Sequence, residues 1–201
     1  MVKSSAEHLS SYLGRVPRTA WIAVGVIGLL VLHAGLLRWM GQPWIYEGGY
    51  IKLWHGDVAS KENSQHLTDW YTLSHIIHGV LLYALLALLF PRTPVGVRLL
   101  AAIGLEIGWE LFENSDMIIN RYREQALAQG YFGDSFVNSV GDVLAAMTGF
   151  LLASKLPKLG SVALVIALEL IALYAIRDSL ALNIIQLVHP IDAIGAWQAA
   201  R

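Results

Sequence analysis

The chain has 201 residues, of which 56% are hydrophobic and only 14% are charged, and its mean hydropathy is +0.53. A soluble domain of this length does not need so much apolar surface for one core, so the composition indicates that much of the chain faces lipid. The formal net charge of -1 and the lack of long Lys or Arg runs argue against a nucleic-acid partner. The chain has no cysteine, which excludes disulfides and thiolate metal sites, so any metal must be held by His, Asp, Glu or backbone oxygen.

Apolar runs of about 20 residues, the length that a helix needs to cross a bilayer, recur along the chain. They cover residues 19–39, 70–90, 97–114, 134–154 and 160–182. The segment before them, 1–18, is polar and lacks the short apolar core of a cleaved signal peptide. We therefore predict an all-α, polytopic membrane helix bundle of about five transmembrane helices. A single domain, 19–182, would then be followed by a C-terminal tail, 183–201.

The connections between these runs predict the orientation of the bundle. Loops 40–69 and 115–133 are long and should share one side, since successive helices alternate in direction. The two short turns on the other side, near Arg92 and Lys155, carry positive charge without acid. Under the positive-inside rule, these turns and the N-terminus lie in the cytoplasm. The sequence thus predicts a multi-pass protein of the cell inner membrane with both long loops outside.

Polar side chains recur at helical spacing in the second, third and fourth runs. The second run has two histidines, the third has three glutamates, and the fourth has two aspartates and an asparagine: His75 and His78; Glu106, Glu110 and Glu113; Asp134, Asn138 and Asp142. Spacings of three and four place each set on one helix face. A charged side chain facing lipid costs several kcal/mol unless it is paired or hydrated. The three faces should therefore meet in a cavity in the outer half of the bilayer.

Two kinds of chemistry fit such a cavity. His75, His78 and Asp134 offer the imidazole and carboxylate ligands of a divalent metal such as zinc or manganese. Carboxylates crowded in a low dielectric have raised and separated proton affinities, which suits general acid and base catalysis. Glu110, Glu113 and Asp142 are the candidate catalytic residues of a hydrolytic or transfer reaction.

Other polar residues have weaker claims to a function. Arg121 and Arg123 lie just outside the cluster, where they could bind an anionic lipid group or anchor the chain at the interface. Together with Asn138 they are the candidate substrate-binding residues. Histidine 33 and Glu169 stand alone in the first and last runs and are expected to make interhelical hydrogen bonds. In the first long loop, residues 53–57 could fold over the cavity mouth.

The fourth run also has small residues, Gly141, Ala145 and Gly149, at four-residue spacing. Such a ridge lets another helix backbone approach closely. The partner helix could belong to the same chain or to a second copy, so a homo-oligomer is left open.

Several segments carry a resemblance to a known family. They are Leu53-Trp54-His55-Gly56-Asp57, the run 70–79, the run 106–123, and Tyr131-Phe132-Gly133-Asp134-Ser135 continued to Asp142. With them, nearly the whole chain resembles an uncharacterised family of alphaproteobacterial multi-pass inner-membrane proteins. More loosely, the order of His78, Glu110 or Glu113, Asp142 and Gly149 is similar to that in VanZ-like membrane proteins. That similarity implies association with the cell envelope and no defined reaction.

The sequence leaves an enzyme and a non-enzymatic protein both open. The leading hypothesis is an integral membrane protein whose cavity binds a membrane lipid or lipid-linked envelope component and hydrolyses or modifies it. The alternative is a binding, assembly or resistance factor in which the polar cluster only holds the helices together. A transporter is a third hypothesis, because carboxylate ladders also serve ion paths.

Overall fold

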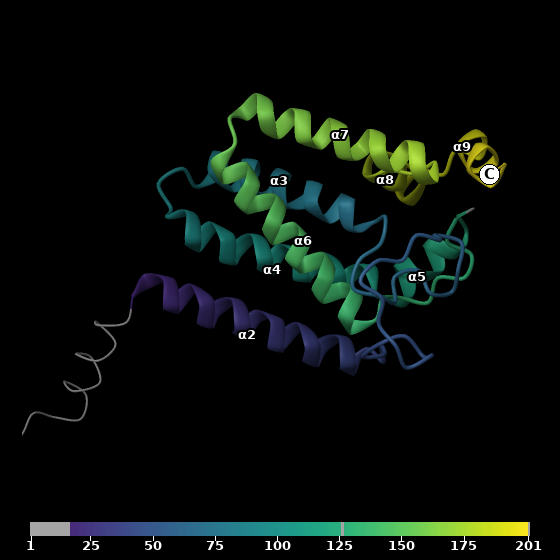
Figure 1. The fold of residues 1–201 in the computed structure, drawn as a ribbon, viewed down its shortest axis with the longest axis horizontal. Coiled ribbons are helices and arrows are strands. Elements are labelled where there is room, and N and C mark those ends of the chain that lie inside the picture. Colours follow the sequence, from purple (N-terminus) through teal and green to yellow (C-terminus); the bar gives the residue numbers. More distant parts are fainter. Residues whose placement is uncertain (1–16, 126, 201) are drawn as a thin grey trace, which may run out of the picture.

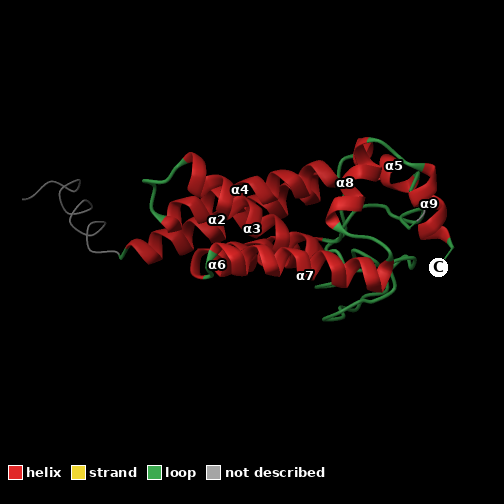
Figure 2. Cartoon of the chain, turned by 90° about the horizontal axis from the view of Figure 1, so that it is seen from above, coloured by secondary structure: helices red, strands yellow, loops and turns green. Residues whose placement is uncertain are grey.

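The computed structural model describes residues 17–125 and 127–200, and these form helices and loops without a strand. The predicted segment 1–18 lies almost wholly outside the described residues. The helices are α2 (Arg18–Trp39), α3 (Thr72–Leu89), α4 (Val95–Glu113), α5 (Asp116–Arg123), α6 (Phe136–Lys155), α7 (Lys158–Ile176), α8 (Leu180–Val188) and α9 (Asp192–Ala199). The five long helices lie side by side, whereas the short ones and loop 40–69 gather at one end (Figures 1 and 2).

Four of the long helices, α2, α3, α6 and α7, are long and apolar enough to cross a membrane. Helix α4 is of similar length and packs against α2, α3 and α6, but one arginine and three glutamates lower its hydropathy. Helices α2 and α7 form the outer edges of the bundle (Figure 1), and most of their side chains are exposed. Apolar side chains such as Ile27 and Leu159 have no protein covering and are suited to face lipid. These features confirm the predicted helical membrane bundle.

The last predicted run, 160–182, is not one helix, and the prediction is wrong there. Helix α7 ends at Ile176, and Arg177 adopts a left-handed backbone conformation with φ 56°. The carboxylate of Glu169 then accepts the backbone N–H groups of Leu180 (2.9 Å) and Ala181 (3.2 Å), which begin α8. Because this carboxylate satisfies N–H groups that no helical carbonyl can reach, a new helix begins there. The predicted tail 183–201 therefore contains most of α8 and the whole of α9.

A second difference lies in the predicted loop 115–133, whose first part is helix α5. Ser115 has the extended conformation of an N-cap residue. An aspartate, Asp116, opens the helix and two arginines, Arg121 and Arg123, close it. These charges complement the helix dipole, and short helices of this kind are hard to recognise from apolar periodicity alone.

Helices α3 and α6 pack backbone to backbone at glycines, as the small-residue ridge predicts. A Cβ atom at Gly149 would lie 1.9 Å from the carbonyl oxygen of Ile76, and one at Gly79 would lie 1.8 Å from that of Ala146. A Cβ atom at Gly141 would likewise lie 1.9 Å from the carbonyl oxygen of Leu67, in loop 40–69. This close approach sets the histidine face of α3 against the aspartate face of α6.

The interior of the bundle changes character along its length. One half is an apolar core that includes Leu86, Ile103 and Phe150. The other half holds most of the buried polar residues, and loop 40–69 covers that end. The loop is tied to α6 by hydrogen bonds from the Ser135 N–H to Ser64 O (2.9 Å) and from the Gln65 side chain to Gly133 O (2.8 Å).

Candidate functional site

Two histidines of α3 share one carboxylate of α4. His75 and His78 lie one turn apart, and their Nδ1 atoms are 2.7 Å and 3.0 Å from Oε1 of Glu106. The two rings stand edge to face with centroids 5.1 Å apart. Glu106 is almost fully buried and has no Lys or Arg partner among the described residues. The three side chains therefore point their ligand atoms at one place.

Glu110 extends this group by one helical turn. Its Oε1 atom lies 3.3 Å from Nδ1 of His75 and is buried without a hydrogen bond. Its other oxygen accepts a hydrogen bond from Ser139, whose hydroxyl also contacts Nε2 of His33 at 3.0 Å. The predicted interhelical hydrogen bond of His33 is thus confirmed, between α2 and α6. The unpaired oxygen of Glu110 faces the imidazole side of the group.

These separations are near those between the ligands of a metal ion. With bonds of 2.0 to 2.1 Å, the ligand atoms of a tetrahedral zinc centre lie about 3.3 Å apart. The separations from Nδ1 of His75 and His78 to Glu106 are the hydrogen-bond lengths 2.7 and 3.0 Å, and that from Nδ1 of His75 to Glu110 is 3.3 Å. Ligand atoms of His75, His78 and Glu106 all lie within 4.8 Å of one another, so these three side chains could hold one ion.

Two further carboxylates continue the cluster. Ligand atoms of His75, Glu110 and Glu113 lie within 4.8 Å of one another. Oδ2 of Asp142 lies 3.9 Å from Nε2 of His75, and its Oδ1 accepts a hydrogen bond from the Thr72 hydroxyl at 3.0 Å. The structure therefore brings together all three candidate catalytic residues and both candidate histidine ligands.

A cavity of about 50 Å³ adjoins this cluster. By the same measure a water molecule needs about 10 to 15 Å³, so the cavity has room for roughly three or four waters. The loop residues 58–60 and 63–64 form part of its wall, so the first long loop reaches the site, but the predicted residues 53–57 do not line the cavity. The titratable side chains that line it are His75, Glu113, Asp134, Asp142, Tyr71, Tyr122 and Tyr131. No Lys or Arg belongs to the described lining.

The two candidate arginines lie elsewhere. Arg121 donates from Nε to the carbonyl of Leu187 (3.0 Å) and from a terminal nitrogen to Glu124 (2.7 Å). Arg123 donates from Nε to the carbonyl of Tyr131 at 2.6 Å. Both guanidinium groups thus brace α5 against neighbouring segments and do not line the cavity.

Asp134 and Asn138 are held by other partners. Asp134 lines the cavity, but its oxygens accept hydrogen bonds from Asn114 (2.6 Å) and Tyr131 (3.0 Å). It therefore lies apart from the ligand atoms of His75 and His78. Asn138 is buried and donates to the carbonyl of His66 at 2.8 Å, so it holds loop 40–69 and is not part of the cavity lining.

Asp69 is almost fully buried, and the sequence did not predict a role for it. Its carboxylate accepts the backbone N–H groups of Ser64 (3.0 Å) and Tyr71 (2.8 Å), and its own N–H donates to Thr72 (3.0 Å). Burial raises the pKa of Asp69. An Asp just before an apolar run, with Thr three residues later, is a helix-start signal that could have identified it.

The stability of this end of the bundle should depend on pH through Asp134. Burial raises its pKa from 3.8 to about 7, against the lowering effect of the Asn114 and Tyr131 hydrogen bonds. The folded protein thus holds this proton more tightly than the unfolded chain. The resulting stabilisation is complete below about pH 3.8 and is lost as the pH rises through about 7.

We therefore expect Asp134→Asn, which mimics the protonated acid, to flatten this part of the pH dependence. Its unfolding temperature in detergent should match that of the wild type near pH 3.8 and exceed it by roughly 10 °C near pH 8. The measurement is thermal unfolding of both proteins across this range. A variant with the same pH slope as the wild type would refute this role of Asp134.

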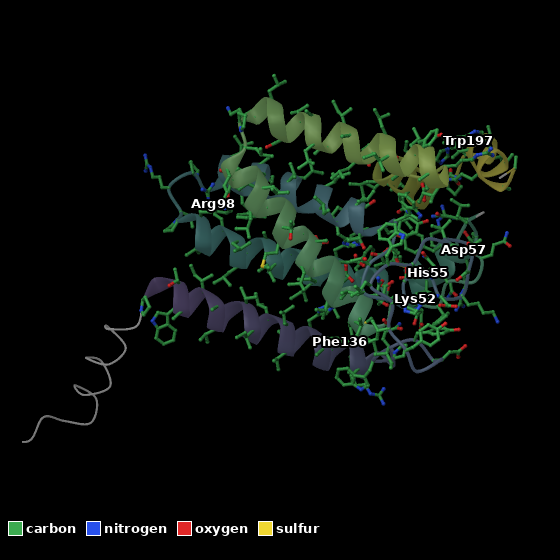
Figure 3. The ribbon with its side chains drawn as sticks, viewed as in Figure 1. Lys52, His55, Asp57, Arg98, Phe136 and Trp197 are labelled. Atoms are coloured by element: carbon green, nitrogen blue, oxygen red, sulfur yellow. The ribbon has the colours of Figure 1, made fainter. Side chains whose placement is uncertain are left out.

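A second histidine cluster lies in loop 40–69, where Figure 3 labels Lys52, His55 and Asp57. Ligand atoms of His55, Glu62 and His66 lie within 4.8 Å of one another. The ammonium group of Lys52, however, contacts Glu62 and lies 3.5 Å from Nδ1 of His55. With His66 it lowers the pKa of Glu62 to about 2.

The protonation of His66 also argues against a metal in this cluster. Its Nδ1 accepts the backbone N–H of Lys52 (3.3 Å), so Nε2 carries the proton and donates to Glu62 (2.8 Å). A metal ion would have to displace both this proton and the lysine. We interpret the cluster as a network that fixes the loop.

The comparisons with known proteins define the family. The sequence profile of a family described as "Protein of unknown function (DUF2585)" matches residues 37–200. A UPF0314 protein of Rhizobium meliloti is 50% identical over 182 residues, which cover 90% of this chain and 92% of that protein. The UPF0314 protein of Brucella anthropi is 50% identical over 177 residues, 88% of this chain and 90% of that protein. The UPF0314 protein of Paracoccus denitrificans is 49% identical over 172 residues, covering 86% and 89%.

No solved structure matches the chain significantly. The looser similarity to VanZ-like proteins stays a prediction. The match to most of the chain and the half-identical relatives confirm the predicted alphaproteobacterial family, so the chain belongs to the DUF2585 family.

Proposed function

We propose that this protein is a metal-dependent enzyme of the cell inner membrane that hydrolyses an ester-type bond in the head group of a lipid or lipid-linked envelope component. In this proposal His75, His78 and Glu106 hold one divalent ion, zinc or manganese, and Glu110 is the neighbouring carboxylate. The observation that carries it is that ligand atoms of His75, His78 and Glu106 lie within 4.8 Å of one another inside the bundle, with Oε1 of Glu110 3.3 Å from Nδ1 of His75. Asp134, considered as a ligand from sequence, takes no part in this ion's coordination.

The position of the site supports an amphiphilic substrate. The cavity lies where α3 and α6 begin, at the end of the bundle that also has the exposed side chains of Trp39, Trp44 and Trp54. Tryptophan is enriched where a bilayer meets water, the depth at which lipid head groups lie. A head group at this depth is level with His75 while its chains stay in the bilayer.

The cavity residues supply the proton chemistry of such a reaction. When bound, a divalent ion supplies a Lewis acid that polarises the ester-type group. Glu113, which lies beside His75 and lines the cavity, takes a proton from a water molecule. The water oxygen bonds to the acyl carbon or phosphorus, the bond to the alcohol oxygen breaks, and the proton passes from Glu113 to the leaving alcohol. Asp142 orients the water from the opposite helix.

Release of head groups from vesicles tests this function. The full chain, purified in dodecyl maltoside with its metal, is reconstituted into vesicles of phosphatidylcholine, phosphatidylethanolamine and phosphatidylglycerol. Mass spectrometry of the aqueous phase then measures any released head group. Because a positioned base contributes about 100-fold or more, Glu113→Gln and Asp142→Asn should reduce release at least about 100-fold while remaining folded. Glu124→Gln, which changes an exposed carboxylate of the same end, should retain the wild-type rate.

The alternative, a non-enzymatic protein in which the polar cluster only holds the helices together, predicts no release of head groups. One observation supports it. Several buried groups, such as Asn138, Asp69 and Ser139, already act as ties between α6 and its neighbours. If the whole cluster had only this role, no head group would be released. Asp142→Ala would lower the unfolding temperature, because it removes the partner of the buried Thr72 hydroxyl, and removing one partner of a buried polar pair costs several kcal/mol.

A further inference from the structure

We propose that the cavity beside the metal ligands binds a cationic nitrogen, so that the substrate is an amphiphile whose head group carries an ammonium. This inference rests on the proposed function, since it assumes that the head group enters this cavity. It goes beyond that function by naming the class of head group. Three features of the cavity carry it: the sign of its charges, its tyrosines and an aspartate oxygen that has no hydrogen bond.

The cavity lining is acidic. Glu113, Asp134 and Asp142 carry carboxyl groups, His75 is engaged with Glu106, and the described lining has no Lys or Arg. A bound cation would favour the ionised form of these carboxyl groups. The two nearby arginines, Arg121 and Arg123, make their hydrogen bonds with residues outside the lining or with its backbone, and they do not line the cavity themselves. Inside a protein like charges repel strongly because the effective dielectric constant is low. An anionic group would therefore be disfavoured here unless a bound metal ion neutralises it, whereas a positive group would neutralise the lining.

Three tyrosines surround the same space, and each hydroxyl group donates a hydrogen bond to a neighbouring segment. Tyr71 donates to Asp178 (3.2 Å), Tyr122 to Asn183 (3.2 Å), and Tyr131 to Asp134 (3.0 Å). The rings of Tyr122 and Tyr131 meet edge to face, with centroids 5.5 Å apart. All three tyrosines belong to the cavity lining. Aromatic rings combined with carboxylates are the means by which proteins recognise ammonium groups.

One acceptor in the cavity has no partner. Asp142 is only 4% exposed and lines the cavity, and its Oδ2 atom makes no hydrogen bond within the described residues. The nearest polar atom recorded for it is Nε2 of His75, at 3.9 Å, which is beyond hydrogen-bond distance. This oxygen is not among the fully buried atoms that have no partner, so an occupant of the cavity can reach it. A bound ammonium would donate to it and supply a positive charge.

The size of the cavity is compatible with such a group. Its volume of about 50 Å³ has room for roughly three or four water molecules, which corresponds to a group of about three or four non-hydrogen atoms. An ammonium with its methyl or methylene substituents falls in this range. A sugar does not.

Binding of small head-group analogues tests the inference directly. Isothermal titration calorimetry of the full, metal-containing chain in dodecyl maltoside would use four probes: choline, ethanolamine, the neutral carbon analogue of choline, and inorganic phosphate. We expect choline or ethanolamine to bind at least about tenfold more tightly than the neutral analogue, a difference of about 1.4 kcal/mol. Equal binding of the charged and neutral probes, binding of neither cation, or tighter binding of phosphate would overturn the inference.

Matched tyrosine variants keep the test independent of folding. Tyr122→Phe keeps the ring and should bind the cation within about twofold of wild type, whereas Tyr122→Leu should weaken binding at least about threefold. Tyr174→Leu changes a tyrosine of α7 that is 94% exposed, and should bind as wild type does. Equal weakening in Tyr122→Phe and Tyr122→Leu would assign the effect to the hydroxyl and contradict a role for the ring.

The vesicle assay separates failure of this inference from failure of the proposed function. Release of glycerol-type head groups from phosphatidylglycerol, without binding of either cation, would retain the hydrolase and reject the ammonium site. Binding of a cation without release of any head group would retain the ammonium site and reject the hydrolase.

Discussion

Gly149→Val is expected to separate α3 from α6 and to prevent recovery of a folded protein. A Cβ atom there would lie 1.9 Å from the carbonyl oxygen of Ile76, a backbone atom that cannot rotate away. Gly79 meets the carbonyl of Ala146 at 1.8 Å from the opposite helix, so Gly79→Val should have the same effect. Overpacking at backbone contacts exceeds the usual cost of about 1 to 3 kcal/mol. The measurement is the fraction of protein that elutes as a monodisperse peak from detergent after mild heating.

Gly104→Ala is the matched control for these variants. Gly104 lies within α4, and a Cβ atom added there would meet no atom within 4 Å. Alanine is favoured over glycine in a helix by about 1 kcal/mol, so this variant should be as stable as wild type or slightly more so. A Gly149→Val protein that survives heating as well as Gly104→Ala would show that the two helices do not pack as described.

The second large effect is expected at Glu106. Its Oε1 atom contacts Nδ1 of both His75 and His78, which no other carboxylate of the described chain does. Glutamine has nearly the same shape, but its neutral amide is a poor ligand for zinc or manganese. Loss of a group that merely supports a ligand reduces metal affinity about 10- to 100-fold. Glu106→Gln should therefore reduce it at least about 100-fold, as measured by elemental analysis after dialysis against a chelator series.

Glu62→Gln provides the comparison, because Glu62 belongs to the other histidine cluster, in which Lys52 contacts the carboxylate. It should retain the wild-type metal content. If Glu106→Gln bound as much metal as the wild type, or if only Glu62→Gln lost its metal, the metal site would lie outside the bundle.

Much of the site could be predicted because helical spacing is a local property. The spacing of His75 and His78, and that of Glu106, Glu110 and Glu113, places each set on one face, and burying those faces requires that they meet. The same reasoning anticipated the close packing at Gly149. These features depend only on the period of the helix and on the cost of exposing charge to lipid.

The roles of particular residues could not be predicted in the same way. Glu106 and Glu110 lie on one face, and only the relative height of α3 and α4 decides which of them reaches both histidines. The same limit applies to Asp134 and Arg121, which precede or follow helices, so the path of the loops sets their partners. The end of α7 depends on Glu169 reaching forward to Leu180, a contact that apolar periodicity does not encode.

The central claim is that the bundle holds one divalent metal ion between α3 and α4. X-ray absorption spectroscopy at the metal edge, on the full chain purified without added chelator, tests it most directly because it reports both the ion and its ligands. We predict one zinc or manganese per chain, bound by two imidazole nitrogens and carboxylate oxygens, with at least one of the two imidazole nitrogens lost from the coordination in His75→Ala. A protein that contains no metal after incubation with zinc or manganese, or a metal bound without imidazole, would contradict the proposed centre.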